Sequence, residues 1–170
     1  MENTSQMILE PVGIVESPLK NPSLRADKNG LNSDHSLDTV REEQEEIRDT
    51  VSQIRIFEPW APLLQGVEAF SHILVLYWPH LIDPEKRQLQ QVHPMGRKDI
   101  PKQGIFATCS PARPNPILVS AVRLLERQEN FLVVQGLEAI DGSPIIDIKP
   151  YSPHYLTVED LKLPKWMAEI

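Results

Sequence analysis

Apolar runs with little helical periodicity dominate the chain and predict a mainly β structure. The run FSHILVLYW at residues 70–78 is rich in β-branched and aromatic residues and predicts a buried strand. Shorter apolar runs predict further strands at 8–15, 53–57, 105–108, 117–125, 131–136 and 144–148. Most connections between these runs are too short for helical crossovers. The pattern therefore predicts a small antiparallel or mixed β-barrel with a few short helices.

Helical periodicity is confined to two places. Apolar residues recur near the helical spacing over 37–50 and predict an amphipathic helix whose charged remainder faces water. Asp83 and Pro84 are the residue types that cap and begin a short helix. Segment 20–50 as a whole is expected to be a variable loop with this helical insertion, because its first part is rich in Pro, Asn and Gly.

The two remaining irregular stretches contain prolines and few long apolar runs. Residues 91–104 predict a long loop, since Pro94, Gly96, Pro101 and Gly104 interrupt them. The end of the chain, 155–170, predicts a docked tail. Its apolar anchors are expected to be Trp166 and Met167.

Length and composition narrow the class of protein. The 170 residues favour one domain, 1–170, and 41% apolar with 24% charged residues is typical of a globular protein. The seven glycines are too scattered for a Rossmann fingerprint or a P-loop. A single cysteine excludes an intrachain disulfide and a thiolate zinc cluster. Without a membrane-spanning run or a secretory signal at the start, we expect a cytoplasmic protein.

Charge is distributed unevenly, and this changes what the net charge of −7 implies. Segment 34–50 holds seven acidic residues against two basic ones, and it predicts a solvated face. Segment 97–127 holds six basic residues against two acidic ones. The overall acidity therefore does not exclude an RNA partner, because the excess lies outside the basic segment.

Three segments place polar residues beside predicted strands, and the first is Phe70-Ser71-His72. Ser71 and His72 begin an otherwise apolar strand. A histidine in this position is either a satisfied residue at a strand end or a hydrogen-bonding group at the rim of a pocket. The segment alone does not decide between them.

The second segment is the proline-rich loop around Arg113 and Asn115. Prolines at 111, 114 and 116 fix the backbone and remove N–H donors, so the loop is either a stiff solvent loop or a preorganised binding loop. Cys109 next to Ser110 is a weak candidate for a nucleophile, because the sequence assigns it no base.

The third segment holds Asp141, Asp147 and Lys149. Asp141 precedes Gly142, which is typical of a hairpin turn. A carboxylate within an apolar strand, such as Asp147, must be paired or functional. Lys149 shares its face, so the two either pair or line a pocket together.

The sequence gives little support for a metal site or for a Ser-His-Asp catalytic triad. The five histidines show no ligand spacing, so no metal site is predicted. A triad from Ser110, His72 and Asp147 lacks the spacing of a nucleophile elbow.

At these segments the sequence resembles the TrmO (TsaA-like) family of S-adenosylmethionine-dependent tRNA methyltransferases. The matching strings are FSHILVLYW (70–78), GIFATCSPARPNPI (104–117) and EAIDGSPIIDIKPYSP (138–153), with PVGIVESPL (11–19) as a weaker match. The resemblance implies a non-Rossmann β-barrel methyltransferase and a homodimer with the cofactor near the subunit interface. It also implies methylation of the exocyclic amine of threonylcarbamoyl-adenosine in the tRNA anticodon loop. The chain lacks the C-terminal extension of many bacterial members and so resembles shorter, archaeal-type ones.

The resemblance also assigns roles to residues of the three segments, which we expect to converge on one pocket. The expected catalytic residues are His72 and Asp147, and the expected substrate contacts are Lys149 and Tyr151. The expected contacts to S-adenosylmethionine are Phe70, Ser71, His72, Arg113, Asn115 and Asp141.

Two departures from the family pattern leave the methyl acceptor open. Cys109 stands where the family usually has Arg, and Leu118 where it usually has Gly. Losing an Arg removes a fork of donors suited to carboxylate or phosphate. A methyltransferase acting on a small molecule is therefore an alternative, as is a non-catalytic S-adenosylmethionine-binding module.

Overall fold

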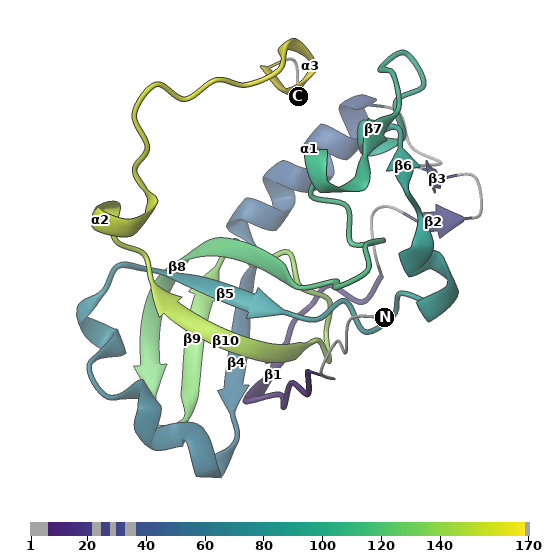
Figure 1. Cartoon of the computed structure of the whole chain (residues 1–170). Helices are drawn as coiled ribbons and strands as arrows, with labels where there is room; N and C mark the ends of the chain where they lie inside the picture. The colour runs from purple at the N-terminus through teal and green to yellow at the C-terminus, as the bar shows by residue number, and fades with distance from the viewer. Residues whose placement is uncertain (1–6, 22–24, 28–29, 33–36, 169–170) are drawn as a thin grey trace.

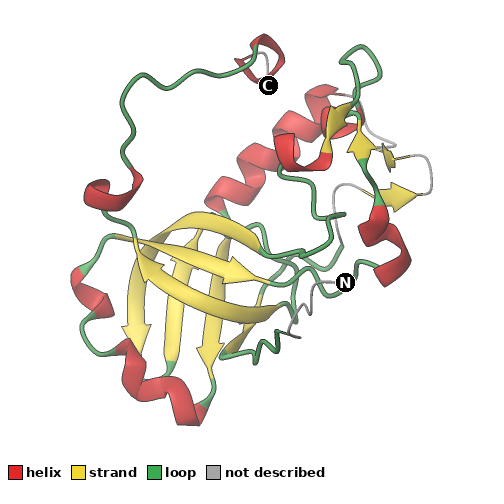
Figure 2. Cartoon of the chain, viewed as in Figure 1, coloured by secondary structure: helices red, strands yellow, loops and turns green. Residues whose placement is uncertain are grey.

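Six strands close into a barrel (Figures 1 and 2). The computed structural model describes residues 7–21, 25–27, 30–32 and 37–168. In spatial order the barrel strands are β1 (Gly13–Glu16), β10 (Pro144–Pro150), β5 (His72–Tyr77), β8 (Leu118–Gln128), β9 (Phe131–Gln135) and β4 (Val51–Ile56). All neighbouring pairs are antiparallel. The predicted mainly β barrel is confirmed.

Buried and more exposed residues alternate along the barrel strands, and the buried side chains fill the barrel interior. In β5, Ile73 and Val75 are fully buried and Tyr77 is nearly so, while the residues between them are more exposed. Similar alternation on the other strands places Ile54 and Leu132 in the same core cluster. Each such aliphatic side chain stabilises the fold by about 1.5–3 kcal/mol through burial.

The shortest barrel strand, β1, closes the barrel by pairing on both sides. Gly13 faces Ile145 of β10 and Ile56 of β4. A Cβ atom at Gly13 would lie 2.5 Å from the carbonyl oxygen of Arg55, so only glycine fits this approach. The predicted strand at 8–15 starts later than expected, and Pro11, which lacks an N–H donor, lies before its start.

Most of the helices lie in the segments that connect the barrel strands. The helices are α1 (Leu37–Asp49), α2 (Pro153–Leu156) and α3 (Lys165–Ala168). The 3-10 helices are η1 (Glu58–Leu64), η2 (Val67–Ala69), η3 (Pro84–Gln88), η4 (Pro94–Gly96) and η5 (Ile105–Ala107). The helix predicted over 37–50 is confirmed as α1. The helix predicted at Asp83-Pro84 is confirmed as η3, with the Asp83 carboxylate accepting from the Glu85 amide at 3.0 Å.

Three short segments differ from expectation. The strand predicted at 105–108 is wrong, because a turn bond from the Thr108 amide to the Ile105 carbonyl (3.2 Å) makes this stretch η5. The loop predicted at 91–104 contains a small hairpin of β6 (Gln91–Val92) and β7 (Gln103–Gly104). Within 20–50, β2 (Arg25–Asp27) pairs with β3 (Gly30–Asn32), and the intervening residues of the predicted loop lie partly outside the described ranges.

The tail after β10 runs away from the barrel wall as a thread that ends in α3 (Figure 1). Residues 153–165 are exposed, whereas Trp166 and Met167 are half-buried. In the described part of the tail, docking onto the chain's own barrel is therefore not seen. Docking onto another surface stays a prediction.

Candidate active site

A cavity of about 500 Å³ lies at the end of the barrel where β5 finishes and β8 begins. Its wall combines segments that are far apart in the sequence. They are the end of α1 (Glu46, Ile47, Thr50), β5 and the chain after it (Tyr77, Pro79, Leu81, Ile82), the proline-rich loop (Cys109, Pro111, Arg113), β8 and its approach (Ile117, Leu118, Val119), the turn before β10 (Glu138, Ile140, Ser143), and Leu19 with Asn21. A mostly apolar concavity with a few polar groups is typical of a small-molecule site.

The proline-rich loop is held together from within by Arg113. Its Nε donates to the Ser110 carbonyl at 2.8 Å, and its Nη2 donates to the carbonyls of Thr108 and Ile105. Ala112, fully buried, packs in a small second core with Val92 and Ile105. The loop is thus preorganised, as one of the two sequence readings expected, and Arg113 both lines the cavity and fixes the loop's shape.

Asn115, the other polar residue of the predicted binding loop, is exposed and is not part of the cavity wall. Its carbonyl accepts from the Ile117 amide at 2.8 Å, which turns the chain toward β8. Its position therefore favours a role in loop geometry.

Asp141 connects the turn before β10 to the chain after β1. Its carboxylate accepts from the Ser17 amide at 2.9 Å and pairs with Lys20 at 2.7 Å. These hydrogen bonds, that from Lys20 first, lower the pKa of Asp141 below its usual value. Asp141 is not among the cavity-lining residues, whereas Ser143, two positions on, is buried and does line the cavity.

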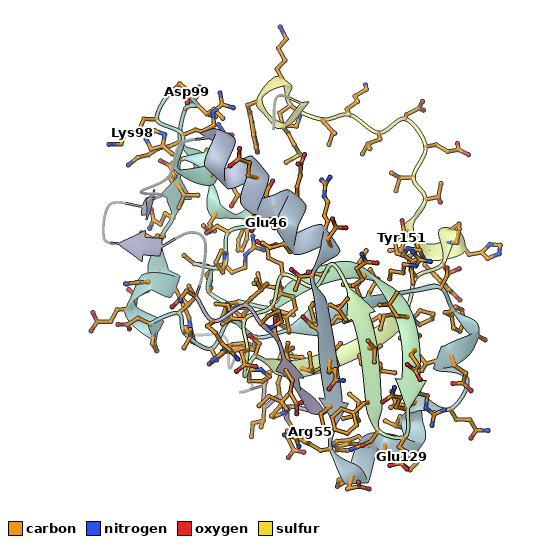
Figure 3. All side chains as sticks on the ribbon, turned by 180° about the vertical axis from the view of Figure 1, so that it is seen from behind. Glu46, Arg55, Lys98, Asp99, Glu129 and Tyr151 are labelled. Carbon is orange, nitrogen blue, oxygen red and sulfur yellow. The ribbon has the colours of Figure 1, made fainter. Side chains whose placement is uncertain are left out.

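Ser71, His72 and Tyr151 gather at the other opening of the barrel, and we call them the far-end cluster. The Ser71 hydroxyl and His72 Nδ1 are 2.9 Å apart, the Tyr151 amide donates to the His72 carbonyl at 3.1 Å, and the two rings lie 6.5 Å apart. Phe70, next to the cluster, is 41% exposed. Figure 3 shows Tyr151 beside α2 and Glu46 on α1, apart from each other along the upper edge of the barrel.

Strand direction explains this separation. β5 begins at His72 and ends at Tyr77, which lines the cavity, and five residues of extended chain span roughly 16 Å. The structure therefore brings the proline-rich loop and the turn before β10 together, but it does not bring the far-end cluster to them. Within one chain the far-end cluster does not line this cavity, and convergence of all three segments on one pocket stays a prediction.

Asp147 and Lys149 also lie apart from the cavity. The Asp147 carboxylate accepts from the Ile148 amide at 2.9 Å and pairs with Lys149. Both side chains are about half exposed. A register shift between Ile145 and Asp147 interrupts the strict alternation of β10. Of the two sequence alternatives, pairing is the one observed.

The sequence patterns do not single out Tyr77 and Glu138, which are polar residues of the cavity wall. Tyr77 is 4% exposed, and burial raises its pKa to about 12. Glu138 is an exposed residue of the cavity wall, yet neighbouring protein atoms desolvate its carboxylate and raise its pKa. Its position between buried Leu137 and Ala139 is a signal that the sequence contains, whereas Tyr77 looks like an ordinary core residue.

Metal-binding clusters and membrane-spanning helices are both absent from the described ranges. No group of three or more His, Cys, Asp or Glu side chains there is placed to hold a metal ion. Nor is any helix in those ranges long and apolar enough to cross a membrane.

Comparison with curated proteins finds close relatives among archaeal proteins. The chain is 40% identical over 156 residues to an S-adenosyl-L-methionine-binding protein of Archaeoglobus fulgidus, covering 92% of this chain and 97% of that protein. It is 41% identical over 143 residues to a probable S-adenosyl-L-methionine-binding protein of Methanothermobacter thermautotrophicus, covering 84% and 88%.

A bacterial relative is longer than this chain. The tRNA (adenine(37)-N6)-methyltransferase of Escherichia coli is 29% identical over 162 residues, which cover 92% of this chain and 62% of that protein. Among solved structures, TrmO from Pseudomonas aeruginosa matches with a TM-score of 0.68 at 21% identity, over 98% of this chain. The chain spans 64% of that TrmO chain, and the likeness shows a shared fold.

The family match covers most of the barrel and the cavity wall. Residues 35–156 match the family model described as the tRNA-methyltransferase O N-terminal domain. This range holds α1, five of the six barrel strands and the proline-rich loop. The chain therefore belongs to the TrmO family.

Proposed function

We propose that the chain is an S-adenosylmethionine-dependent methyltransferase that methylates N6 of threonylcarbamoyl-adenosine in the tRNA anticodon loop. The observation that carries the proposal is the cavity, which the proline-rich loop and the turn before β10 build together at one end of a TrmO-family barrel. The names of the archaeal and bacterial relatives support the cofactor and the reaction.

The cavity fits the chemical character of this cofactor. A volume of about 500 Å³ suits an adenosine-sized ligand, and apolar walls suit its base and thioether carbons. The Thr50 and Ser143 hydroxyls on the cavity wall supply hydrogen-bond partners. When bound there, S-adenosylmethionine supplies an electrophilic methyl group on its sulfonium.

The chain's own contribution is positioning and exclusion of water. Arg113 and the prolines around it keep the loop rigid, so a ligand meets a preformed wall. Exposed Lys98 and Lys102 lie in the segment that leads into this loop and supply charge for RNA phosphates. Figure 3 shows Lys98 in the part that projects from the barrel beside α1.

The homodimer that the family resemblance implies is part of the proposal. It matters for the predicted roles of the far-end cluster, Asp147 and Lys149. These residues lie away from the cavity of their own chain, so they meet a ligand bound there only if a second copy presents its far opening to that cavity. On this arrangement His72 and Asp147 keep their proposed catalytic roles, and Lys149 and Tyr151 their proposed substrate contacts.

The test is transfer of labelled methyl from S-adenosylmethionine to tRNA that carries threonylcarbamoyl-adenosine, followed by digestion and identification of the labelled nucleoside. We expect the label on that nucleoside, with tRNA affinity that falls steeply as salt is added. Absence of label on it, with protein that binds the cofactor, would contradict the assignment.

A small-molecule acceptor is the second candidate, and two observations favour it. Cys109 and Leu118, the departures from the family pattern, both line the cavity. The archaeal relatives are named only for binding S-adenosylmethionine. Label on a metabolite instead of tRNA supports this candidate, and binding without transfer to either supports a non-catalytic module.

A further inference from the structure

We infer that Glu138 is the catalytic proton acceptor of this cavity. The inference rests on the proposed methyl transfer and adds the group that removes the proton from the acceptor nitrogen. Two observations carry it: the residues on either side of Glu138 are buried, and the carboxylates of Asp141 and Asp147 are already engaged in ion pairs.

The backbone around Glu138 is fixed on both sides. Leu137 and Ala139 are buried in the barrel core, at 0% and 1% exposure, and the Glu138 side chain between them lines the cavity. The carboxylate is therefore presented from a rigid segment of the wall, which is what a catalytic group requires.

The other carboxylates that the sequence favoured are already engaged. Asp141 pairs with Lys20 and accepts from Ser17, and Asp147 pairs with Lys149. Glu138 has no hydrogen bond or ion pair to another described residue. It is thus a carboxylate on the cavity wall whose oxygens are available to a substrate.

Four titratable or charged groups share the cavity wall with Glu138. Tyr77 stays neutral, with a pKa raised to about 12 by burial, by desolvation first and also by the charge of Glu138. The Arg113 guanidinium is directed at the loop carbonyls, and Glu46 and Cys109 are exposed, as Glu138 is. Desolvation raises the pKa of Glu138, which makes its carboxylate a stronger base.

The step balances without any further reactant. The acceptor nitrogen forms a bond to the methyl carbon while the carbon–sulfur bond breaks and its electron pair stays on sulfur. Glu138 takes the proton from that nitrogen and becomes a neutral carboxylic acid. It returns the proton to water through the open mouth of the cavity after the products leave.

Glu138→Gln tests the inference, because it keeps the shape of the side chain and removes its basicity. We expect kcat to fall about 100- to 10,000-fold, with cofactor affinity from calorimetry within about twofold of wild type. The matched control is Glu126→Gln, on the exposed outer face of β8, which should leave kcat unchanged.

The pH dependence gives a second readout. Wild-type kcat should rise with pH as Glu138 loses its proton, and Glu138→Gln should lack this rise. Carbon-13 NMR of labelled glutamate should show one carboxyl titrating above the usual range in wild type and absent from Glu138→Gln.

The outcomes separate this inference from the proposed function. Wild-type kcat and pH profile retained in Glu138→Gln would overturn the proton-acceptor role and leave the methyltransferase intact. Lost cofactor affinity in that variant would also overturn it and assign Glu138 to cofactor binding instead. A wild-type protein that transfers no methyl group contradicts the proposed function and, with it, the role of Glu138.

Discussion

Residues with similar sequence patterns make different contacts in this structure. Asp141 and Glu138 are three positions apart in one turn, yet Asp141 is held by Lys20 and Ser17 while Glu138 lies unpaired in the cavity. Both are carboxylates in the short segment before β10. What separates them is the approach of the chain after β1, which brings Lys20 to Asp141.

The contacts of Asp141 predict how stability depends on pH. Its pKa in the folded protein is lowered from the ordinary value of 3.8, so its stabilising contribution is present above that value and is lost as pH falls through the lowered pKa. Asp141→Asn should therefore lower the free energy of unfolding at neutral pH, and the difference from wild type should shrink as pH falls toward the lowered pKa. Urea unfolding at about pH 6 and about pH 2.5 measures both.

Lys20→Met provides the control for this pair. Because Lys20 is the largest cause of the lowered pKa, Asp141→Asn should have much less effect in a Lys20→Met background. An Asp141→Asn effect that is the same at both pH values would contradict the account.

The site was only partly predictable from such residues. Arg113 and the turn around Asp141 are recognisable because prolines and Asp-Gly leave local signals. His72 and Tyr151 carry equally distinctive motifs, but their place at the far opening depends on the direction of β5 and on barrel closure. Tyr77 gives no local signal, since an aromatic residue at the end of a buried strand is typical of a core.

At the scale of elements, strand patterns were the reliable signal and short connections were not. β5 and α1 follow their predicted bounds closely because each has a long periodic pattern. Residues 105–108 were predicted as a strand from a short apolar run, but Phe106 is 82% exposed and the segment forms η5. An apolar run of only four residues does not distinguish a strand from a single helical turn.

Barrel closure at β1 predicts that Gly13→Ala is destabilising. The added methyl group would lie 2.5 Å from the Arg55 carbonyl oxygen, within the pairing of β1 with β4, so the strands must separate. We expect a loss of about 1–3 kcal/mol in the free energy of unfolding, the usual cost of overpacking. Denaturant unfolding followed by circular dichroism measures it.

Gly104→Ala is the matched control. A Cβ at Gly104 meets no heavy atom within 4 Å, and its backbone has an ordinary negative φ of −56°. This variant should lose no stability. Equal stability of the two variants would show that β1 is not held as closely as the structure indicates.

At the scale of the whole molecule, the exposed tail is the feature that a single chain does not explain. Tyr155 in α2 and Val158, Leu161 and Leu163 after it are each more than half exposed. In Figure 1 the backbone after α2 runs away from the barrel. Apolar side chains in this number usually mark a surface that another molecule covers. In the proposed homodimer, the second copy of the chain covers these apolar side chains.

We therefore predict that a chain ending at Ser152 dimerises more weakly than the full chain. Light scattering after size-exclusion chromatography should give twice the monomer mass for the full chain and a lower mass for the truncated one at the same concentration. Circular dichroism should show an unchanged barrel in both. A truncated chain that dimerises as strongly as the full chain would contradict this role for the tail.

The central claim is that the cavity between the proline-rich loop and the turn before β10 binds the cofactor, and amide NMR during titration with S-adenosylmethionine tests it most directly. We predict that the largest shift changes occur at Cys109, Leu118, Val119 and 138–143. Changes centred on Ser71, His72 and Tyr151, with none around the cavity, would contradict the claim.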